Sequence, residues 1–187
     1  MDEIRIENLR TLKDTGYIKL KKINVLLGRN SSGKSTFARL FPLLKQGSKL
    51  KSKSGLIWFG PDVDFGTFQD AKSTSASKNE TINFSFTKKN LHVDSKSLYF
   101  HRKQNSKRNL SSRLGKVYVK VEISEDERKR ASYELKAGDC TARFTMNGII
   151  ESNFSINGID LTRSAREYMY FYRHSGLLPD VYPVDTA

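Results

Sequence analysis

Cysteine and histidine are scarce in this sequence of 187 residues. The single cysteine, Cys140, excludes a disulfide within the chain, which fits a reducing compartment and predicts a cytoplasmic location. The three histidines, His92, His101 and His174, do not cluster with Cys140 in the sequence. A zinc site gathers such side chains at short spacings, so none is predicted.

Long hydrophobic runs are also missing. No apolar stretch approaches the roughly 20 residues that a membrane-spanning helix needs, so no membrane association is predicted. The first ten residues, MDEIRIENLR, carry acidic side chains early and lack the apolar region of a secretory signal. With 37% hydrophobic and 28% charged residues, the composition is typical of a soluble globular chain of one or two domains.

Acidic residues are few relative to basic ones, and the formal net charge is +13. Excess positive charge raises the affinity for polyanions because binding releases their counterions, so DNA or RNA is a predicted partner. The alternatives are an acidic protein partner or solubility alone. The positive charge gathers in two segments, 45–54 and 101–113, whose candidate phosphate contacts are Lys45, Lys49, Lys51, Lys53, Arg102, Lys103, Lys107, Arg108 and Arg113.

The stretch GRNSSGKST, residues 28–36, fits the phosphate-loop pattern G-x-x-x-x-G-K-[ST]. The apolar run INVLL, residues 23–27, precedes it and predicts a strand buried on both faces of a sheet. The segment 35–47 follows it, with apolar residues at a helical spacing: Phe37, Leu40, Phe41 and Leu44. Pro42 is expected to kink this helix, and Gly47 to end it.

A phosphate chain needs many hydrogen-bond donors in a small concavity, and backbone amides of a glycine-rich loop supply them. The helix that begins at the loop directs its N-terminal amides and dipole toward the anion, with the amides of Ser35 and Thr36 reaching the phosphates. Lys34, the predicted catalytic residue, should bridge the β- and γ-phosphates, and the Ser35 hydroxyl should coordinate Mg²⁺. The predicted nucleotide-binding residues of the loop are Gly28, Asn30, Ser31, Ser32, Gly33, Lys34, Ser35 and Thr36.

From residue 81 onward the sequence alternates between apolar and polar residues. Short turn-rich links separate the alternating segments, which predicts antiparallel strands with one buried face and one wet face. A helix is expected at 161–176, because Ser164 and Glu167 form a capping-box pattern before an apolar stripe. The predicted strands are 81–88, 116–123, 131–137, 141–146 and 152–158.

The first 45 residues resemble the start of an ABC-type ATPase. They are similar to the group that holds chromosome-maintenance (SMC) proteins, RecF-like repair proteins and overcoming-lysogenisation-defect and related phage-defence ATPases. The segments that carry the resemblance are IRIENLRTLKDTGYIKL and INVLLGRNSSGKST. The resemblance implies an α/β fold, a P-loop NTPase lobe of ABC type with an antiparallel β-subdomain, and ATP and Mg²⁺ as cofactors. Its expected parts are a P-loop core at 1–70, the β-subdomain at 81–160 and the helix at 161–176.

The resemblance also implies two site residues outside the loop. An arginine in the NLR stretch lies near the nucleotide phosphates in this group, and Arg10 matches it. A glutamine-bearing loop coordinates Mg²⁺ and senses the γ-phosphate, and DFGTFQDAK resembles that region with Gln69 in place. The alternatives are a surface arginine at a strand end and a solvent-facing glutamine.

Two parts of the family pattern are missing from residues 1–187. One is an apolar strand that ends in Asp-Glu, which holds Mg²⁺ and activates water, and the other is a serine-glycine signature helix. The chain is therefore expected to be the N-terminal part of an ATPase head and to be inactive alone. The resemblance implies a head-to-tail dimer of two copies around two nucleotides, with a nuclease or another effector as a possible partner.

Three functions remain open from the sequence. The first is an ATPase that drives a DNA-directed process such as repair, chromosome maintenance or anti-phage defence. The second is a P-loop kinase of a small substrate, for which Arg102, Arg108 and Arg113 would have to serve as a lid. The third is a nucleic-acid-binding module with a degenerate nucleotide site, which the basic segments favour and the intact Lys34-Ser35 pair does not.

Overall fold

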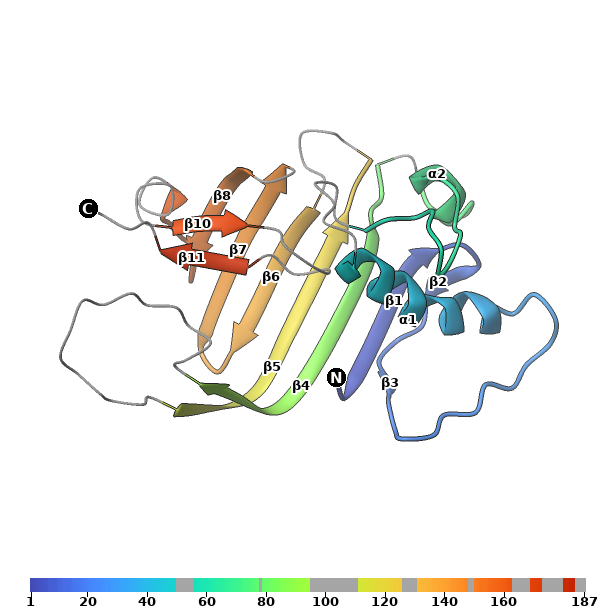
Figure 1. The fold of residues 1–187 in the computed structure, drawn as a ribbon, viewed down its shortest axis with the longest axis horizontal. Coiled ribbons are helices and arrows are strands. Elements are labelled where there is room, and N and C mark those ends of the chain that lie inside the picture. The colour runs from blue at the N-terminus through green and yellow to red at the C-terminus, as the bar shows by residue number, and fades with distance from the viewer. Residues whose placement is uncertain are drawn as a thin grey trace.

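The computed structural model describes residues 1–49, 56–77, 79–94, 111–125, 131–147, 150–162, 169–172 and 180–183. Within them, one antiparallel sheet forms the body of the fold, and the long helix α1 (Lys34–Lys49) lies over one of its faces (Figure 1). A second helix, α2 (Phe68–Ala71), is a single turn near the β1 end of the sheet.

The main sheet has nine strands in the described part of the chain, in the order β2-β1-β4-β5-β6-β7-β8-β9, with β3 also paired to β1. Every strand pairing among the described residues is antiparallel. The described strands therefore lack the parallel arrangement that is expected of a P-loop core. The strands are β1 (Glu3–Leu9), β2 (Leu12–Asp14), β3 (Ile18–Lys19), β4 (Ile82–Asp94), β5 (Ser111–Ile123), β6 (Ala131–Ala137), β7 (Cys140–Asn147), β8 (Ile150–Ile156) and β9 (Ile159–Asp160).

The alternating sequence pattern is confirmed as strand structure over β4 to β8. The register places apolar side chains of neighbouring strands opposite each other: Ile6 pairs with Phe84, and Phe84 with Val121. All three side chains are fully buried. Because side chains alternate between the faces of a strand, the intervening polar residues form the opposite face of the sheet.

Helix α1 contributes the other half of the core. Phe37, Leu40 and Leu43 are buried in the same cluster as Ile4 and Ile6 of β1. The helix continues through Pro42 and beyond the stop predicted at Gly47. Its buried stripe also differs from the predicted one, because Phe41 is 40% exposed.

The prediction of a buried strand at residues 23–27 is wrong for this structure. Ile23, Val25 and Leu27 are 83%, 76% and 88% exposed. Figure 1 shows the segment as a wide loop that leaves the sheet after β3 and returns at the start of α1. No main-chain hydrogen bond joins residues 22–27 to another segment in the part of the chain that the structure describes. An apolar run favours burial, but residues 22–27 pair with none of the strands in the described part of the chain.

The expected helix at 161–176 is also wrong at residues 169–172. Met169–Tyr172 forms strand β10, which pairs with β11 (Asp180–Pro183) in a two-stranded sheet. The aromatic run MYFY suits a strand as well as a helix, and the pairing with β11 decides between them. The capping pair Ser164 and Glu167 lies outside the described residues.

None of the described helices is long and apolar enough to cross a membrane.

Candidate phosphate-binding site

The loop at residues 28–36 adopts backbone conformations that depend on glycine. Gly28 and Gly33 have φ angles of 153° and 91°, and Ser31 between them has φ 60°. A Cβ at Gly28 would lie 2.8 Å from the Ser32 hydroxyl oxygen, and a Cβ at Gly33 would lie 2.4 Å from Cδ2 of Leu12. Both φ angles are ones that residues with a side chain rarely adopt, and a Cβ at either position would also force its neighbour to move, so the loop is strained by a side chain at these two positions.

Lys34 closes the loop from the helix side. Its ammonium nitrogen Nζ donates to the carbonyl oxygens of Gly28 at 2.7 Å and Arg29 at 2.6 Å. The side chain therefore folds back over the loop instead of extending into solvent. These two contacts hold the ammonium beside the loop, where a cation can bind a phosphate oxygen.

The first turn of α1 supplies main-chain amide donors next to the Lys34 ammonium and the loop. The first helical hydrogen bond runs from the Phe37 amide to the Gly33 carbonyl. The amides of Lys34, Ser35 and Thr36 have no main-chain acceptor within the described residues, as is usual at a helix N-terminus. Ser35 is exposed, so its hydroxyl is accessible for coordination. These donors, together with the glycine cradle and Lys34, fit a triphosphate with Mg²⁺.

Arg10 lies on the turn between β1 and β2, next to the loop. That turn packs against the loop, because Thr11 and Leu12 are the nearest neighbours of a Cβ at Gly33. The Arg10 guanidinium lies over the Phe65 ring, 4.7 Å from its centroid. Its Nε is a buried donor that has no hydrogen-bond partner among the residues that the structure describes. A buried, unpartnered donor on a cation beside a phosphate loop fits a role toward an anion.

Gln69 lies on α2, and the main chain ties α2 to Arg10. The Arg10 amide donates to the Ala71 carbonyl at 2.8 Å. Hydrogen bonds from the main chain and the hydroxyl of Thr67 hold the pKa of Asp70 below its usual value, and the charge of Arg10 acts in the same direction. The structure thus brings Arg10 between the phosphate loop and the segment that carries Gln69.

The Gln69 side chain itself is directed elsewhere. Its amide Nε2 donates to the carboxylate of Glu125, which follows the end of β5. No hydrogen bond joins Gln69 to residues 28–36 in the described part of the chain. Glu125 was not singled out from the sequence. It stands 56 residues from Gln69 in a run of charged residues, and nothing local distinguishes it from its neighbours.

The two basic segments lie largely outside the described residues. Lys45 is exposed near the C-terminal end of α1. Arg113 lies on β5, where only the backbone is described. The remaining candidate phosphate contacts of these segments stay predictions.

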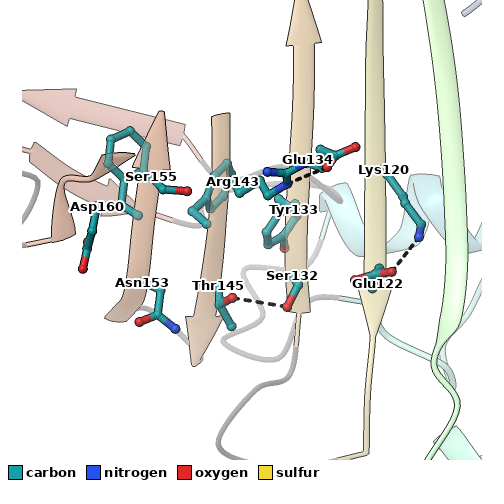
Figure 2. A pocket seen from close by; sticks show the side chains of 12 residues that line it. Lys120, Glu122, Ser132, Tyr133, Glu134, Arg143, Thr145, Asn153, Ser155 and Asp160 are labelled. Atoms are coloured by element: carbon teal, nitrogen blue, oxygen red, sulfur yellow. Dashed lines mark hydrogen bonds and ion pairs between the residues drawn. The ribbon is translucent and has the colours of Figure 1, made fainter. Parts of the chain in front are cut away.

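A hollow away from the phosphate loop lies on the polar face of the sheet and has a volume of about 430 Å³ (Figure 2). Its two cations each have a carboxylate partner: Lys120 pairs with Glu122 at 2.6 Å, and Arg143 pairs with Glu134 at 2.6 Å. Ser132 and Thr145 share a hydrogen bond across β6 and β7. Since its cations already have carboxylate partners, this hollow is not suited to phosphate, and the loop remains the candidate site.

Comparison with known proteins gives one match. A family model described as AAA ATPase domain matches residues 1–169. No curated protein and no solved structure matches the chain.

Proposed function

Because this chain belongs to the AAA ATPase domain family, we propose that residues 28–36 bind the triphosphate of ATP together with Mg²⁺. ATP binding and hydrolysis are the general chemistry of that family. The observation that carries the proposal is the Lys34 ammonium, held 2.7 Å and 2.6 Å from the carbonyl oxygens of Gly28 and Arg29. The cation is fixed within a loop that glycine alone allows to close.

The residues of the loop take distinct roles. The amides of Lys34, Ser35 and Thr36 donate to phosphate oxygens, and the dipole of α1 favours the negative charge there. The Lys34 ammonium binds the β- and γ-phosphates, and the Ser35 hydroxyl holds Mg²⁺. When bound, Mg²⁺ neutralises phosphate charge and helps to orient the transferring group. Arg10 adds a second cation beside the loop, and Gln69 adds an amide oxygen as a further magnesium ligand.

Hydrolysis needs a carboxylate that orients water and donors that stabilise the transferring phosphoryl group. We propose that an apolar strand ending in Asp-Glu supplies the carboxylate by docking along residues 22–27. The exposure of Ile23, Val25 and Leu27 supports this, because an extended apolar segment gains free energy when another strand covers it. A signature helix from a second copy would complete the site, which makes the assembly a head-to-tail homo-oligomer of ABC type.

The proposed role of the ATPase is a DNA-directed process, such as repair, chromosome maintenance or anti-phage defence, with a nuclease or another effector as partner. The formal net charge of +13 supports contact with a nucleic acid. The two basic segments are the proposed contact regions. The resemblance of the first 45 residues to SMC-like and defence ATPases supports the same class of process.

Phosphate release tests the division of roles. Purified 1–187 with Mg²⁺ and ATP should release phosphate no faster than its Lys34→Ala variant. Addition of a fragment that carries the Asp-Glu strand end and the signature helix should raise the rate for the wild type and leave Lys34→Ala unchanged. Rapid release from 1–187 alone that disappears in Lys34→Ala would contradict the proposal. A carboxylate within this chain would then be catalytic, and Asp180 and Asp185 would be the first to replace.

A further inference from the structure

We propose that Arg29 and Arg39 form a cationic entrance to the phosphate loop, which speeds the capture of phosphate chains from solution without holding them once they are bound. The inference rests on the proposed function, because the ligand it concerns is the triphosphate of that site. It starts from the distribution of charge along the chain. The stretch 15–61 contains ten basic residues and no acidic one, and the phosphate loop lies within it.

Basic side chains on the polar face of the sheet, opposite α1, are neutralised by neighbouring carboxylates. A paired cation contributes little to the field at a distance, because the charge of its partner cancels it. The polar face therefore adds little to the positive potential of the molecule. The pairs, with N–O distances in parentheses, are Arg5 with Asp14 (2.7 Å), Lys116 with Glu3 (3.0 Å), Lys120 with Glu122 (2.6 Å), Lys136 with Glu134 (2.9 Å) and Arg143 with Glu134 (2.6 Å).

The side chains of Arg29 and Arg39 differ from these in having no carboxylate partner. Both are exposed, and neither forms a hydrogen bond or an ion pair within the described residues. Together with Lys34 they place three positive charges in and beside the loop, and the nearest acidic residues in the sequence are Asp14 and Asp62. Like charges that are gathered in this way attract an anion, because the anion relieves their mutual repulsion.

The two arginines lie at either end of the loop sequence. Arg29 is the second residue of the loop, and its main-chain carbonyl accepts a hydrogen bond from Lys34 Nζ at 2.6 Å. Arg39 lies on α1 four residues after Ser35. Residues at this spacing share a helix face, and a rise of about 1.5 Å per residue separates them by about 6 Å along the axis. Both charges therefore lie within roughly one Debye length, about 8 Å at physiological ionic strength, of an anion that enters the loop.

The effect of the cationic entrance is expected on the rate of association. Exposed guanidinium groups remain hydrated, so their attraction for an anion reaches far but is weak at contact. Charged surfaces around a site raise the association rate of an oppositely charged ligand by about 10- to 1,000-fold, and the effect falls as the ionic strength rises. Dissociation depends instead on the amides and the Lys34 ammonium that hold the bound phosphates.

Stopped-flow measurement of binding, with a fluorescent ATP analogue as the probe, tests the proposal. In the double variant Arg29→Gln with Arg39→Gln, the association rate constant at about 0.01 M ionic strength should fall about tenfold, and the dissociation rate constant should change by less than about twofold. At about 1 M, where the Debye length is about 3 Å, variant and wild type should associate at similar rates. Arg29→Lys with Arg39→Lys keeps both charges and should associate like the wild type.

A control double variant, Lys116→Gln with Arg143→Gln, removes two paired cations from the polar face and should keep the wild-type association rate. Equal slowing in this control would overturn the proposal, as would slowing of equal size at low and high ionic strength or a change confined to dissociation. A wild type that does not bind the analogue would overturn the proposed function and this inference together. Wild-type binding with unchanged association in Arg29→Gln with Arg39→Gln would overturn this inference alone.

Discussion

A Cβ on Gly33 would lie 2.4 Å from Cδ2 of Leu12, so the phosphate loop packs directly against the turn between β1 and β2. This contact links the nucleotide loop to Arg10, two residues before Leu12, and through the Arg10 amide to α2 and Gln69. Main-chain and packing contacts therefore join three separate stretches of sequence at the candidate site, although the Gln69 side chain is directed to Glu125.

Gly33→Ala should both destabilise the fold and abolish ATP binding. The new Cβ would clash with the Leu12 side chain, and the φ angle of 91° at residue 33 is unfavourable for alanine. We therefore expect a loss of about 2–3 kcal/mol in the free energy of unfolding. Urea denaturation measures this loss. Gly138→Ala is the matched control, since it has a φ of 57° and no atom within 4 Å of its Cβ. It should lose about 1 kcal/mol and keep its ATP affinity. Equal losses in the two variants would contradict the contact.

Arg10→Met should weaken ATP binding without lowering thermal stability. Methionine keeps an apolar contact with Phe65 and removes the buried Nε donor that has no partner. Loss of the cation–π contact costs about 1 kcal/mol, and removal of an unpartnered buried donor recovers a similar amount. Thermal denaturation and ATP calorimetry on the same samples measure the two effects. A lower melting temperature with unchanged ATP affinity would show that Arg10 serves the fold and not the nucleotide.

Asp14 should make part of the stability depend on pH in the acid range. Hydrogen bonds from the Arg5 guanidinium, and then from the Gly16 amide, lower the pKa of Asp14 to about 2. Because the folded-state pKa is depressed, the stabilisation is complete above the ordinary aspartate pKa of 3.8 and is lost as the pH falls toward about 2. The Asp14 side chain is 45% exposed, so solvent screening limits the effect to below about 1 kcal/mol.

Urea denaturation at pH 5 and pH 2.5 tests the Asp14 effect. The wild type should lose more stability between the two pH values than Asp14→Asn, which cannot ionise at that position. An identical loss in the two proteins would assign the acid sensitivity to other carboxylates.

The basic segments 45–54 and 101–113 should contact nucleic-acid phosphates. The logarithm of the affinity for DNA should then fall linearly with the logarithm of the salt concentration. Replacing four residues, Lys49, Lys51, Lys103 and Lys107, by alanine should flatten that slope and weaken all sequences alike. Replacement of Lys13, Lys19, Lys21 and Lys22 is the charge-matched control. A slope that survives the first set and changes with the second would place the binding surface at the N-terminal strands.

Strand structure from β4 to β8 was predictable because an alternating sequence records one buried and one wet face. The phosphate loop was predictable for a similar reason, because its glycines and Lys34 all lie within nine consecutive residues. The structure of residues 23–27 was not predictable, because an apolar run indicates burial but does not identify the segment that covers it. The sequence of Met169–Tyr172 is compatible with a helix or a strand, and only its pairing with β11 shows that it is a strand. Glu125 could not be found from the sequence, because its contact with Gln69 spans 56 residues.

Calorimetric titration of Mg-ATP into the wild type and into Lys34→Ala tests the central claim most directly. Lys34 is half-buried on the loop, so its removal should leave the circular dichroism spectrum unchanged and cost little stability. Its contact with phosphate is charge-assisted, and loss of about 3 kcal/mol corresponds to roughly a hundredfold weaker binding. The account predicts measurable binding of Mg-ATP to the wild type and at least this hundredfold loss of affinity in Lys34→Ala. Equal affinity of the two folded proteins for Mg-ATP would contradict the assignment of residues 28–36 as a phosphate loop.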